Sequence, residues 1–410
     1  MAGWHRREDP EGQLLTTYDV IVVGLGGMGS ATLYHLARRG LRVLGLDRYD
    51  VPHEYGSSHG LTRIIRLAYW EHPTYVALLR RSYQLWRKLE QDAGEQLLHI
   101  TGSIDAGPAD GPVFSGALRS SELHGLPHEV MTGDELHRRF PGYRLPRGTQ
   151  CLYQPEGGFL LPERCNLAHL AGAKAAGAEA HTQEQVIEWG ATSGECWVAT
   201  SKASYQANRL VLCAGAWASK LIPELTGLAQ PERQVLAWLE PSRPELFTPE
   251  RFPVFYVEVE EGRFYGLPSF LVPGFKLGRY HHRGEQVDPD SMHREVEPED
   301  EELLRGFAAR YFPDGAGPAL MTKTCLFTNS PDEHFILDLH PEHPRVAIAA
   351  GFSGHGYKFC SVVGEIMADL CQRSETRHEI GLFRLGRFQG LGSRRAVPNQ
   401  HQQSGNKTGP

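Results

Sequence analysis

Two arginines in an apolar segment are the first side chains whose type and spacing suggest chemistry. Arg63 and Arg66 stand three positions apart in "GLTRIIRLAY". A buried guanidinium needs an anionic partner, because an uncompensated buried charge is costly. A flavin or phosphate edge, or a substrate carboxylate, would supply that partner through paired hydrogen bonds. On this segment alone, pairing with acidic residues at the surface explains both arginines equally well.

The loop before these arginines is rich in small residues. Gly56, Ser57, Ser58 and Gly60 surround His59. Residues of this kind allow the backbone to come close to a planar group. We therefore predict that the loop lies against the ring of a cofactor.

Two lysines also occupy positions that suggest a partner. Lys358 follows three glycines in "GFSGHGYKFC", at the start of a helical pattern, where a positive charge opposes the helix dipole. A nearby anion explains this lysine better than capping does, and a lysine extended to solvent is the alternative. Lys276 lies in the strand-like run "PGFKLGRYHH", eleven residues after Tyr265. It is either a base of lowered pKa, or a charge beside developing negative charge, or an ordinary strand-end residue, and Tyr265 fits a core position equally well.

A single cysteine, Cys325, stands in the strand-like run "MTKTCLFTNSPDEHFILD". Burial alone explains such a thiol, because free cysteine is among the most buried residue types. The chain has seven cysteines, an odd number without a C-x-x-C pair. This pattern argues against a disulfide framework and against a thiolate zinc site, so we expect no metal.

The elements that must position these side chains begin with a glycine-rich turn. Gly24, Gly26 and Gly29 follow the apolar run "YDVIVV" and open a helical pattern. Glycines at this spacing permit a tight turn and bring a pyrophosphate close to the helix N-terminus. Asp47 ends the next apolar run, 23 residues after Gly24, where it can accept hydrogen bonds from a ribose. The motif predicts a dinucleotide without choosing between NAD and FAD, and a glycine turn with no ligand is the alternative.

The alternation of strands and helices predicts an α/β protein of two domains. We expect a Rossmann-like nucleotide-binding domain assembled from three segments, and a β-rich substrate domain with a large mixed or antiparallel sheet. Helical patterns appear at 73–93, near 133–140 and after 160, whereas 100–153 and 234–328 otherwise consist of short strand-like runs. The predicted parts are an N-terminal extension (1–17), nucleotide-binding segments (18–99, 155–230 and 329–388), substrate-domain segments (100–154 and 231–328) and a disordered tail (389–410).

Composition narrows the classes of partner. The 410 residues carry a net charge of −7 without a block of like charge, which indicates neither a nucleic-acid nor a membrane-surface partner. The first residues lack the apolar segment of a secretory signal, and no run approaches the ~18 apolar residues of a membrane span. We therefore expect a protein of the reducing cytoplasm.

Three motifs together resemble the monomeric sarcosine oxidase family of flavoprotein amine oxidases, which includes N-methyltryptophan oxidase and pipecolate oxidase. The motifs are "GSSHGLTRIIR", "KTCLFTNSPDEHFILDLHP" and "GFSGHGYKF", in the family's order and approximate spacing, and the resemblance covers about residues 18–388. It implies FAD-dependent oxidation of a secondary amino acid, sarcosine or a similar N-alkyl or cyclic amino acid, to an imine, with O₂ reduced to H₂O₂. It also implies a monomer.

The resemblance carries roles to particular residues. Cys325 matches the cysteine that binds the flavin covalently through an 8α-S-cysteinyl bond. Arg66 and Lys358 match the clamp for the substrate carboxylate, with Lys358 also beside the cofactor. Lys276 matches the oxygen-activating lysine, and Tyr265 matches the active-site tyrosine. The positions that match flavin neighbours are His59, Thr62, Arg63, Gly354 and His355; of these, His59 and Arg63 are also predicted to act in catalysis and Gly354 in substrate binding.

The chain departs from the family pattern in three places. Ser58 precedes His59 where the family often has two histidines, and the pattern Lys-x-Gly-Tyr-His here contains Arg279 as an added residue. One added residue in a strand reverses the side-chain faces unless a bulge absorbs it. We predict His281 as the active-site histidine, with His282 as the alternative. Tyr256 replaces a flexible apolar residue, and we expect it to contact the substrate.

Other functions are compatible with parts of the pattern. A related flavoprotein could oxidise D-amino acids, or an amine dehydrogenase could pass electrons to another acceptor. An NAD-dependent dehydrogenase would use the same glycine turn. A flavin-binding protein without catalysis would retain the cofactor and produce no H₂O₂. Lys276 and Cys325 favour the oxidase.

Overall fold

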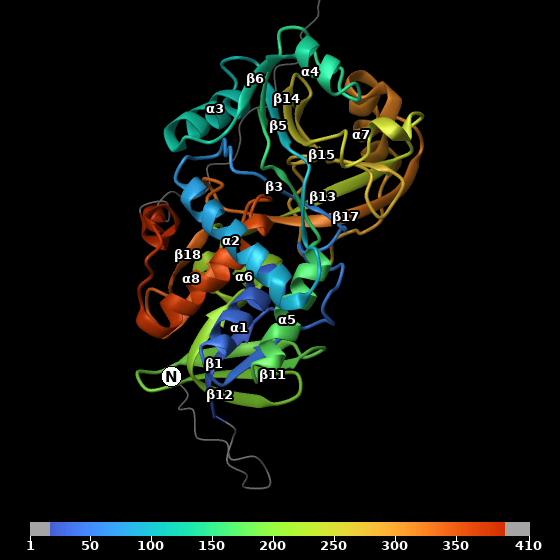
Figure 1. Cartoon of the computed structure of the whole chain (residues 1–410). Helices are drawn as coiled ribbons and strands as arrows, with labels where there is room; N and C mark the ends of the chain where they lie inside the picture. Colours follow the sequence, from blue (N-terminus) through green and yellow to red (C-terminus); the bar gives the residue numbers. More distant parts are fainter. Residues whose placement is uncertain (1–16, 390–410) are drawn as a thin grey trace, which may run out of the picture.

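The computed structural model describes residues 17–389. Nearly all of the predicted disordered tail (389–410) and of the predicted N-terminal extension (1–17) lies outside this range. Within it, the strands form two eight-stranded sheets and one three-stranded sheet. Figure 1 shows the two large sheets in opposite halves of the molecule, with β13 and β17 running along the boundary between them.

The first large sheet has the parallel core expected of a nucleotide-binding domain. Strands β1, β2, β9, β12 and β19 pair in parallel, and β10, β11 and β18 add antiparallel edges. Its central strands are buried apolar runs, as parallel strands covered on both faces must be. The strands are β1 (Thr17–Val23), β2 (Val43–Leu46), β9 (Glu179–His181), β10 (Val186–Ala191), β11 (Cys196–Thr200), β12 (Ser204–Leu212), β18 (Ile336–Leu339) and β19 (Val346–Ala350).

Four helices pack into one apolar core beside this sheet. They are α1 (Gly27–Arg38), α2 (Tyr75–Ala93), α5 (Pro162–Ala175) and α8 (Cys360–Arg373). Helices α1 and α8 approach closely at Gly364, where a Cβ would lie 2.6–2.8 Å from atoms of Ala31. A short helix, α6 (Ala218–Leu221), follows β12.

The second large sheet is mixed, as predicted. Its order is β17-β13-β16-β15-β14-β5-β7-β6, and only β14 and β5 pair in parallel. The strands are β5 (Ser103–Gly107), β6 (Glu129–Thr132), β7 (Gln150–Gln154), β13 (Gln230–Leu239), β14 (Val254–Val259), β15 (Gly262–Leu267), β16 (Phe275–Arg279) and β17 (Ala319–Asn329). An aromatic-rich core lies on one face, where Phe264 stacks on Phe307 at 3.7 Å between ring centroids.

The small sheet has the order β3-β8-β4 and holds the arginine segment. Strand β3 (Arg63–Ile65) pairs with β8 (Gly158–Leu160), and β8 pairs with β4 (Leu98–Ile100). This pairing fixes the backbone of Arg63 opposite Leu160.

The fold class and the strand–glycine turn–helix unit are confirmed, but the prediction of only one short helix in the substrate segments was wrong. Besides α4 (Gly133–Arg139), two longer helices are present, α3 (Pro112–His124) and α7 (Pro298–Tyr311). Both begin with proline, and a capping box of Glu297 and Asp300 starts α7. Proline in the first turn and a capping box are ordinary signals for a helix start. We gave them less weight than the strand-like runs on either side, and so predicted no helix at these positions. No helix of residues 17–389 is long and apolar enough to cross a membrane.

Candidate active site

One cavity of about 370 Å³ brings together residues from distant segments of the chain. It is lined by Gly24 and Gly26 of the first turn and by Asp47 at the end of β2. It is also lined by seven of the side chains predicted for chemistry, namely Arg63, Arg66, Tyr256, Tyr265, Lys276, Cys325 and Lys358. The predicted dinucleotide site therefore shares one space with three of the predicted catalytic residues, Arg63, Tyr265 and Lys276. Within residues 17–389 no group of three His, Cys, Asp or Glu side chains is arranged to hold a metal ion.

The turn after β1 has the close backbone approach that a pyrophosphate requires. Gly24 adopts a φ of +85°, and a Cβ on Gly29 would overlap the carbonyl oxygen of Gly24. The amide of Gly27 donates to Ser58 Oγ at 3.0 Å, which ties the turn to the loop before Arg63. Only glycine fits this turn, and Gly26 and Gly27 at the N-terminus of α1 line the cavity, where a helix N-terminus favours an anion.

Asp47 is fixed by the same turn. Its Oδ2 accepts a hydrogen bond from the amide of Leu25 at 2.7 Å, and its Oδ1 accepts one from the amide of Tyr49 at 2.9 Å. Burial raises the pKa of Asp47, and the two amides oppose that rise. A carboxylate so held at the end of β2 retains lone pairs for ribose hydroxyls. The glycine turn and the Asp47 carboxylate thus fit the ADP half of a dinucleotide.

The loop around His59 is held by charged side chains. Gly60 and Leu61 have positive φ values of 97° and 69°, and their amides donate to Glu163 Oε1 at 2.7 and 3.0 Å. His59 is 1% exposed, and neither of its ring nitrogens has a hydrogen-bond partner among the described residues. Burial and the neighbouring Arg63 lower the pKa of His59 to about 3, so the ring is neutral. His59 itself does not line the cavity, whereas Thr62 and Arg63 do.

Cys325 lies on β17 opposite Gln234 of β13 and faces the cavity at 4% exposure. Nη2 of Arg63 donates to its Sγ at 3.5 Å. The same guanidinium donates to the carbonyls of Thr62 and Ser57 at 2.9 and 3.0 Å, so its position is fixed. Lys323, two residues before the cysteine, pairs instead with Glu54. Arg63 is therefore the cation placed to stabilise a thiolate at this position.

Lys276 is almost fully buried, at 1% exposure. Its Nζ donates to the carbonyls of Gly60 and Thr62 at 2.6 and 2.8 Å and lies 3.1 Å from Thr62 Oγ1. Burial, reinforced by the charge of Arg63, holds the pKa of Lys276 well below its usual value. Tyr265 stands opposite Gly278, the residue two positions after Lys276, and burial raises its pKa. Lysine and tyrosine therefore line the same part of the cavity wall.

The two residues of the predicted carboxylate clamp, Arg66 and Lys358, line the cavity at 3% and 5% exposure. Arg66 already has two acidic partners, because Nη2 lies 3.2 Å from Glu71 Oε2 and Nε lies 3.0 Å from Asp105 Oδ1. Lys358 Nζ donates to the carbonyl of His355 at 2.8 Å. Burial and the charge of Arg66 lower the pKa of Lys358 to about 7. Both cations can reach an anion in the cavity, and two carboxylates share the site with them.

The pairing of β16, the strand that carries Lys276, determines which side chains after the added Arg279 face the cavity. Strands β15 and β16 pair without a bulge, and the amide of Tyr280 donates to the carbonyl of Arg263 at 2.8 Å. Tyr280 therefore stays on the face of Lys276 and Gly278 and lines the cavity. Its hydroxyl donates to the carbonyl of Ser353 at 2.8 Å.

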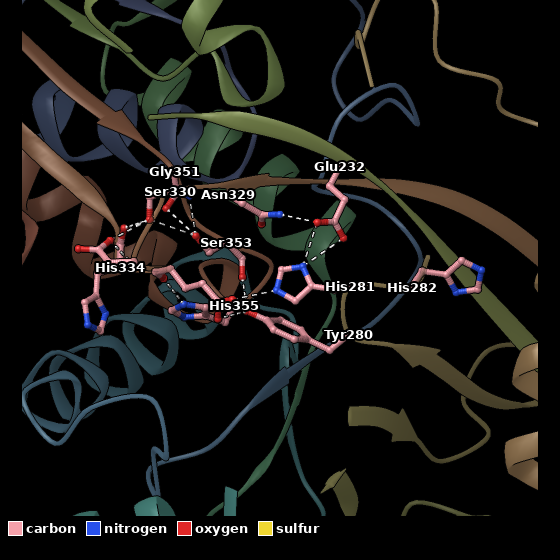
Figure 2. Close-up of polar contacts among 12 residues, drawn as sticks. Glu232, Tyr280, His281, His282, Asn329, Ser330, His334, Gly351, Ser353 and His355 are labelled. Atoms are coloured by element: carbon pink, nitrogen blue, oxygen red, sulfur yellow. Dashed lines mark hydrogen bonds and ion pairs between the residues drawn. The ribbon is translucent and has the colours of Figure 1, made fainter. Parts of the chain in front are cut away.

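Neither His281 nor His282, the two candidates for the active-site histidine, lines the cavity. His281 has a φ of +56° and lies 3.0 Å from Glu232 Oε2 and 3.0 Å from Glu333 Oε1. Burial alone would lower the pKa of His281, but the hydrogen bonds to both carboxylates raise it to about 9. The ring of His282 points away from Tyr280 and His281, as Figure 2 shows. It is fully buried, and its Nε2 lies 2.9 Å from Asp300 Oδ1. Tyr280 lines the cavity where we expected the active-site histidine.

The glycine-rich loop after β19 places Lys358 in η5 (Tyr357–Phe359). Gly354 has a φ of +75° and lies against the ring of Phe327 so closely that a Cβ would overlap it. Nε2 of His355 donates to the carbonyl of Glu333 at 2.9 Å, and Nδ1 accepts from the hydroxyl of Tyr69 at 2.6 Å. Burial lowers the pKa of His355 to about 3, so this ring is a neutral link between loop and core. Gly354 and His355 both line the cavity.

Sequence reasoning missed several residues of this site. Tyr280 and Phe327 line the cavity, and Trp70 joins their aromatic cluster. Glu71 lines the cavity and Asp105 lies behind it, both beside Arg66. A lone acid in the buried run "SIDAG" was the one available signal for Asp105, because unpaired buried carboxylates are rare.

The chain is similar to known proteins over most of its length. Residues 19–370 match the family described as FAD dependent oxidoreductase. The monomeric sarcosine oxidase of Bacillus sp. (strain NS-129) is 42% identical over 377 residues, which is 91% of this chain and 97% of that protein. N-methyl-L-tryptophan oxidase of Escherichia coli (strain SMS-3-5 / SECEC) is 35% identical over 91% of this chain and all of that protein.

One solved structure is similar to this chain in both fold and sequence. The open form of NikD, described as an unusual amino acid oxidase essential for nikkomycin biosynthesis, has a TM-score of 0.78 at 27% identity. The match covers 89% of this chain and 96% of that chain. The glycine turn, Asp47 and the cavity fit the cofactor that the family description names. The chain therefore belongs to the FAD dependent oxidoreductase family, among the relatives of monomeric sarcosine oxidase.

Proposed function

We propose that this enzyme oxidises a secondary amino acid, sarcosine or a close N-alkyl or cyclic relative, with O₂ as the electron acceptor. The amine loses two electrons and two protons to become an imine, which water hydrolyses, and O₂ gains them as H₂O₂. The observation that carries the proposal is the shared cavity of Arg66, Lys358, Lys276 and Cys325. Its support among known proteins is the 42% identity to a monomeric sarcosine oxidase.

Arg66 and Lys358 bind the substrate carboxylate in this proposal. Arg66 is fixed by two acids, whereas Lys358 Nζ makes one hydrogen bond within residues 17–389, which leaves two of the three N–H donors of an ammonium for the ligand. A carboxylate held by both cations orients the rest of a small substrate, and such positioning can lower the barrier by several kcal/mol.

The aromatic side of the cavity contacts the rest of the substrate. Tyr256, Tyr280 and Phe327 form one cluster with Val113, and Tyr265 packs against it. The hydroxyl of Tyr256 has no hydrogen-bond partner among residues 17–389. The amine must be unprotonated to be oxidised, and the nearby cations Arg66 and Lys358 favour its neutral form.

FAD, when bound, accepts the two electrons of the amine and returns them to O₂. Gly24, Gly26, Gly29 and Asp47 would hold its ADP part, and Thr62, Arg63, Gly354 and His355 would line its ring, with His59 behind them. We propose that Cys325 Sγ forms a thioether with the flavin 8α carbon. Formation of that bond removes one hydrogen from the thiol and one from the 8α methyl group, and O₂ is the oxidant for these two electrons.

Lys276 is the proposed site of oxygen activation. In its protonated form, a buried lysine beside O₂ stabilises negative charge as it develops on oxygen, and it does so more strongly than in water because the site is dry. Tyr265 would border the same position. We also propose that segments 18–99, 155–230 and 329–388 form the FAD-binding domain, that 100–154 and 231–328 form the substrate domain, and that the enzyme is a cytoplasmic monomer.

The test is an H₂O₂ assay of purified protein with sarcosine, N-methyltryptophan, pipecolate, proline and D-amino acids. We expect H₂O₂ with at least one secondary amino acid and none with the D-amino acids. H₂O₂ from D-amino acids alone would indicate the related flavoprotein function. Reduction of an artificial acceptor without H₂O₂ would indicate a dehydrogenase, and a yellow protein that oxidises no amine would contradict an enzymatic role.

A further inference from the structure

Asp105 is a buried acid that the proposed chemistry does not yet use. It lies in β5 between Tyr256 of β14 and Leu152 of β7, and it is fully buried. Its Oδ1 is 3.0 Å from Nε of Arg66, yet neither carboxylate oxygen has a hydrogen bond of ordinary angle among the described residues. A carboxylate with so few partners is expensive to keep charged in the interior.

The charges around Asp105 are balanced before any ligand binds. Two cations, Arg66 and Lys358, stand beside two acids, Asp105 and Glu71, and the most exposed of the four side chains is 8% exposed. A substrate carboxylate would add one uncompensated negative charge to this dry cluster. Such a charge is costly unless another group is neutralised at the same time.

We propose that Asp105 positions the guanidinium of Arg66 and takes up a proton from solvent when a carboxylate ligand binds. The inference rests on the proposed function, because it assigns the substrate carboxylate to Arg66 and Lys358. The proton converts the Asp105 carboxylate into a neutral carboxyl group, and no other bond changes. Arg66 then pairs with Glu71 on one side and with the ligand on the other.

The surroundings of Asp105 favour this protonation. The titratable groups that face it are Arg66, Tyr69 and Glu71 of the segment after β3, Tyr256 of β14 and Lys358 of η5. On its other side, β7 contributes the apolar Leu152. Burial raises the pKa of Asp105 to about 7, Arg66 opposes the rise, and Glu71 adds to it. A ligand carboxylate would act in the same direction as Glu71.

Lys358 is a competing group, because its pKa is also near 7 and a bound anion would favour its charged form. The experiment must therefore separate two proton acceptors. Substitution of one acceptor at a time separates them. Proton uptake by Asp105 persists when Lys358 is replaced, and proton uptake by Lys358 persists when Asp105 is replaced.

The test is titration calorimetry of the FAD-loaded enzyme with methoxyacetate, the oxygen analogue of sarcosine. Comparison of buffers with different ionisation enthalpies at pH 8 gives the number of protons taken up. The uncharged analogue methoxyacetamide is the control ligand. We expect proton uptake with methoxyacetate and none with methoxyacetamide, and the Kd of methoxyacetate should rise about tenfold per pH unit for each proton taken up.

In Asp105→Asn the uptake should fall by about one proton per ligand, whereas in Lys358→Gln an uptake of about one proton should remain. Asp105→Leu provides the same comparison if the asparagine variant does not fold. Equal uptake in wild type and both Asp105 variants, or loss of all uptake in Lys358→Gln, would overturn the inference. So would the absence of uptake in wild type. If any of these results occurs while an amino acid still yields H₂O₂, only the inference fails; if neither methoxyacetate binds nor any amine is oxidised, the proposed function fails as well.

Discussion

Nη2 of Arg63 donates a hydrogen bond to the Sγ of Cys325 over 3.5 Å, although 262 positions separate the two residues in the chain. Neither residue alone indicates a reaction. Together, at the wall of the cavity, they place a fixed cation beside a thiol that can act as a nucleophile.

We expect wild-type protein to remain yellow after acid precipitation, and Cys325→Ala to release its flavin into the supernatant. The thioether would be the only covalent link, so its loss should separate protein and cofactor completely. Mass spectrometry of the denatured chain checks the result through the added mass of FAD. Cys151→Ala, at a buried thiol of β7 outside the cavity, is the matched control and should stay yellow. Colourless denatured wild type would refute the tether.

Lys276→Met should slow the reaction of the reduced enzyme with O₂ by about 10²–10³-fold, since it removes a preorganised charge from a dry site. Reduction of the enzyme by substrate should change much less. Stopped-flow absorbance separates the two half-reactions. Lys358→Met is the control, because it removes a lysine from the same cavity and should leave the O₂ reaction near its wild-type rate. An unchanged O₂ reaction in Lys276→Met would remove this lysine from the proposed role.

The two residues of the carboxylate clamp should differ in their effect on stability. Arg66→Met leaves Glu71 and Asp105 buried without their cation, and breaking a buried pair in this way costs about 3–5 kcal/mol. Lys358→Met loses one hydrogen bond to a backbone carbonyl and should cost about 1 kcal/mol. Urea unfolding of both variants measures the difference.

Lys358→Met should also raise the KM of the preferred amino acid about 10- to 100-fold, because a hydrogen bond to a charged group contributes about 1.5–3 kcal/mol. The matching primary or secondary amine without a carboxylate is the control substrate. If its KM rises by the same factor, Lys358 does not recognise the carboxylate.

Tyr280→Phe tests which side chain after β16 faces the substrate. The change removes the hydroxyl that donates to Ser353, the residue before Gly354, and should lower kcat/KM while costing about 1 kcal/mol in stability. His281→Gln should change kcat/KM less, since this residue does not line the cavity. Steady-state kinetics on the same substrate compares them. A larger loss in His281→Gln would return the active-site role to the histidine.

His281 should make stability depend on pH. Its folded pKa of about 9 lies above its ordinary 6.5, so its contribution is complete below about pH 6.5 and is lost as the pH rises to about 9. Because Glu333 is partly exposed, the contribution is about 1–2 kcal/mol. Urea unfolding should show His281→Gln less stable than wild type at pH 6 and equal to it near pH 10. His293→Gln, which breaks an exposed pair with Glu297, should show almost no difference at either pH.

The parts of this protein that the sequence predicted correctly depend on neighbours along the chain. The turn from Gly24 to Gly29 and the helix after it follow from local backbone requirements, because only glycine allows that close approach. The parallel core followed from continuous apolar runs. The helices α3 and α7 were missed although Pro112, Pro298 and the Glu297–Asp300 capping box were readable in the sequence.

Only the tertiary structure decided which side chains meet. Tyr280, and not His281, reaches the cavity because β15 and β16 pair without a bulge, and a side chain's face depends on that pairing. Asp105 becomes a partner of Arg66 only when β5 packs behind the segment after β3. Pairing register and long-range packing are properties of the whole fold, so no motif around Arg66 alone could have shown that Asp105 shares its charge.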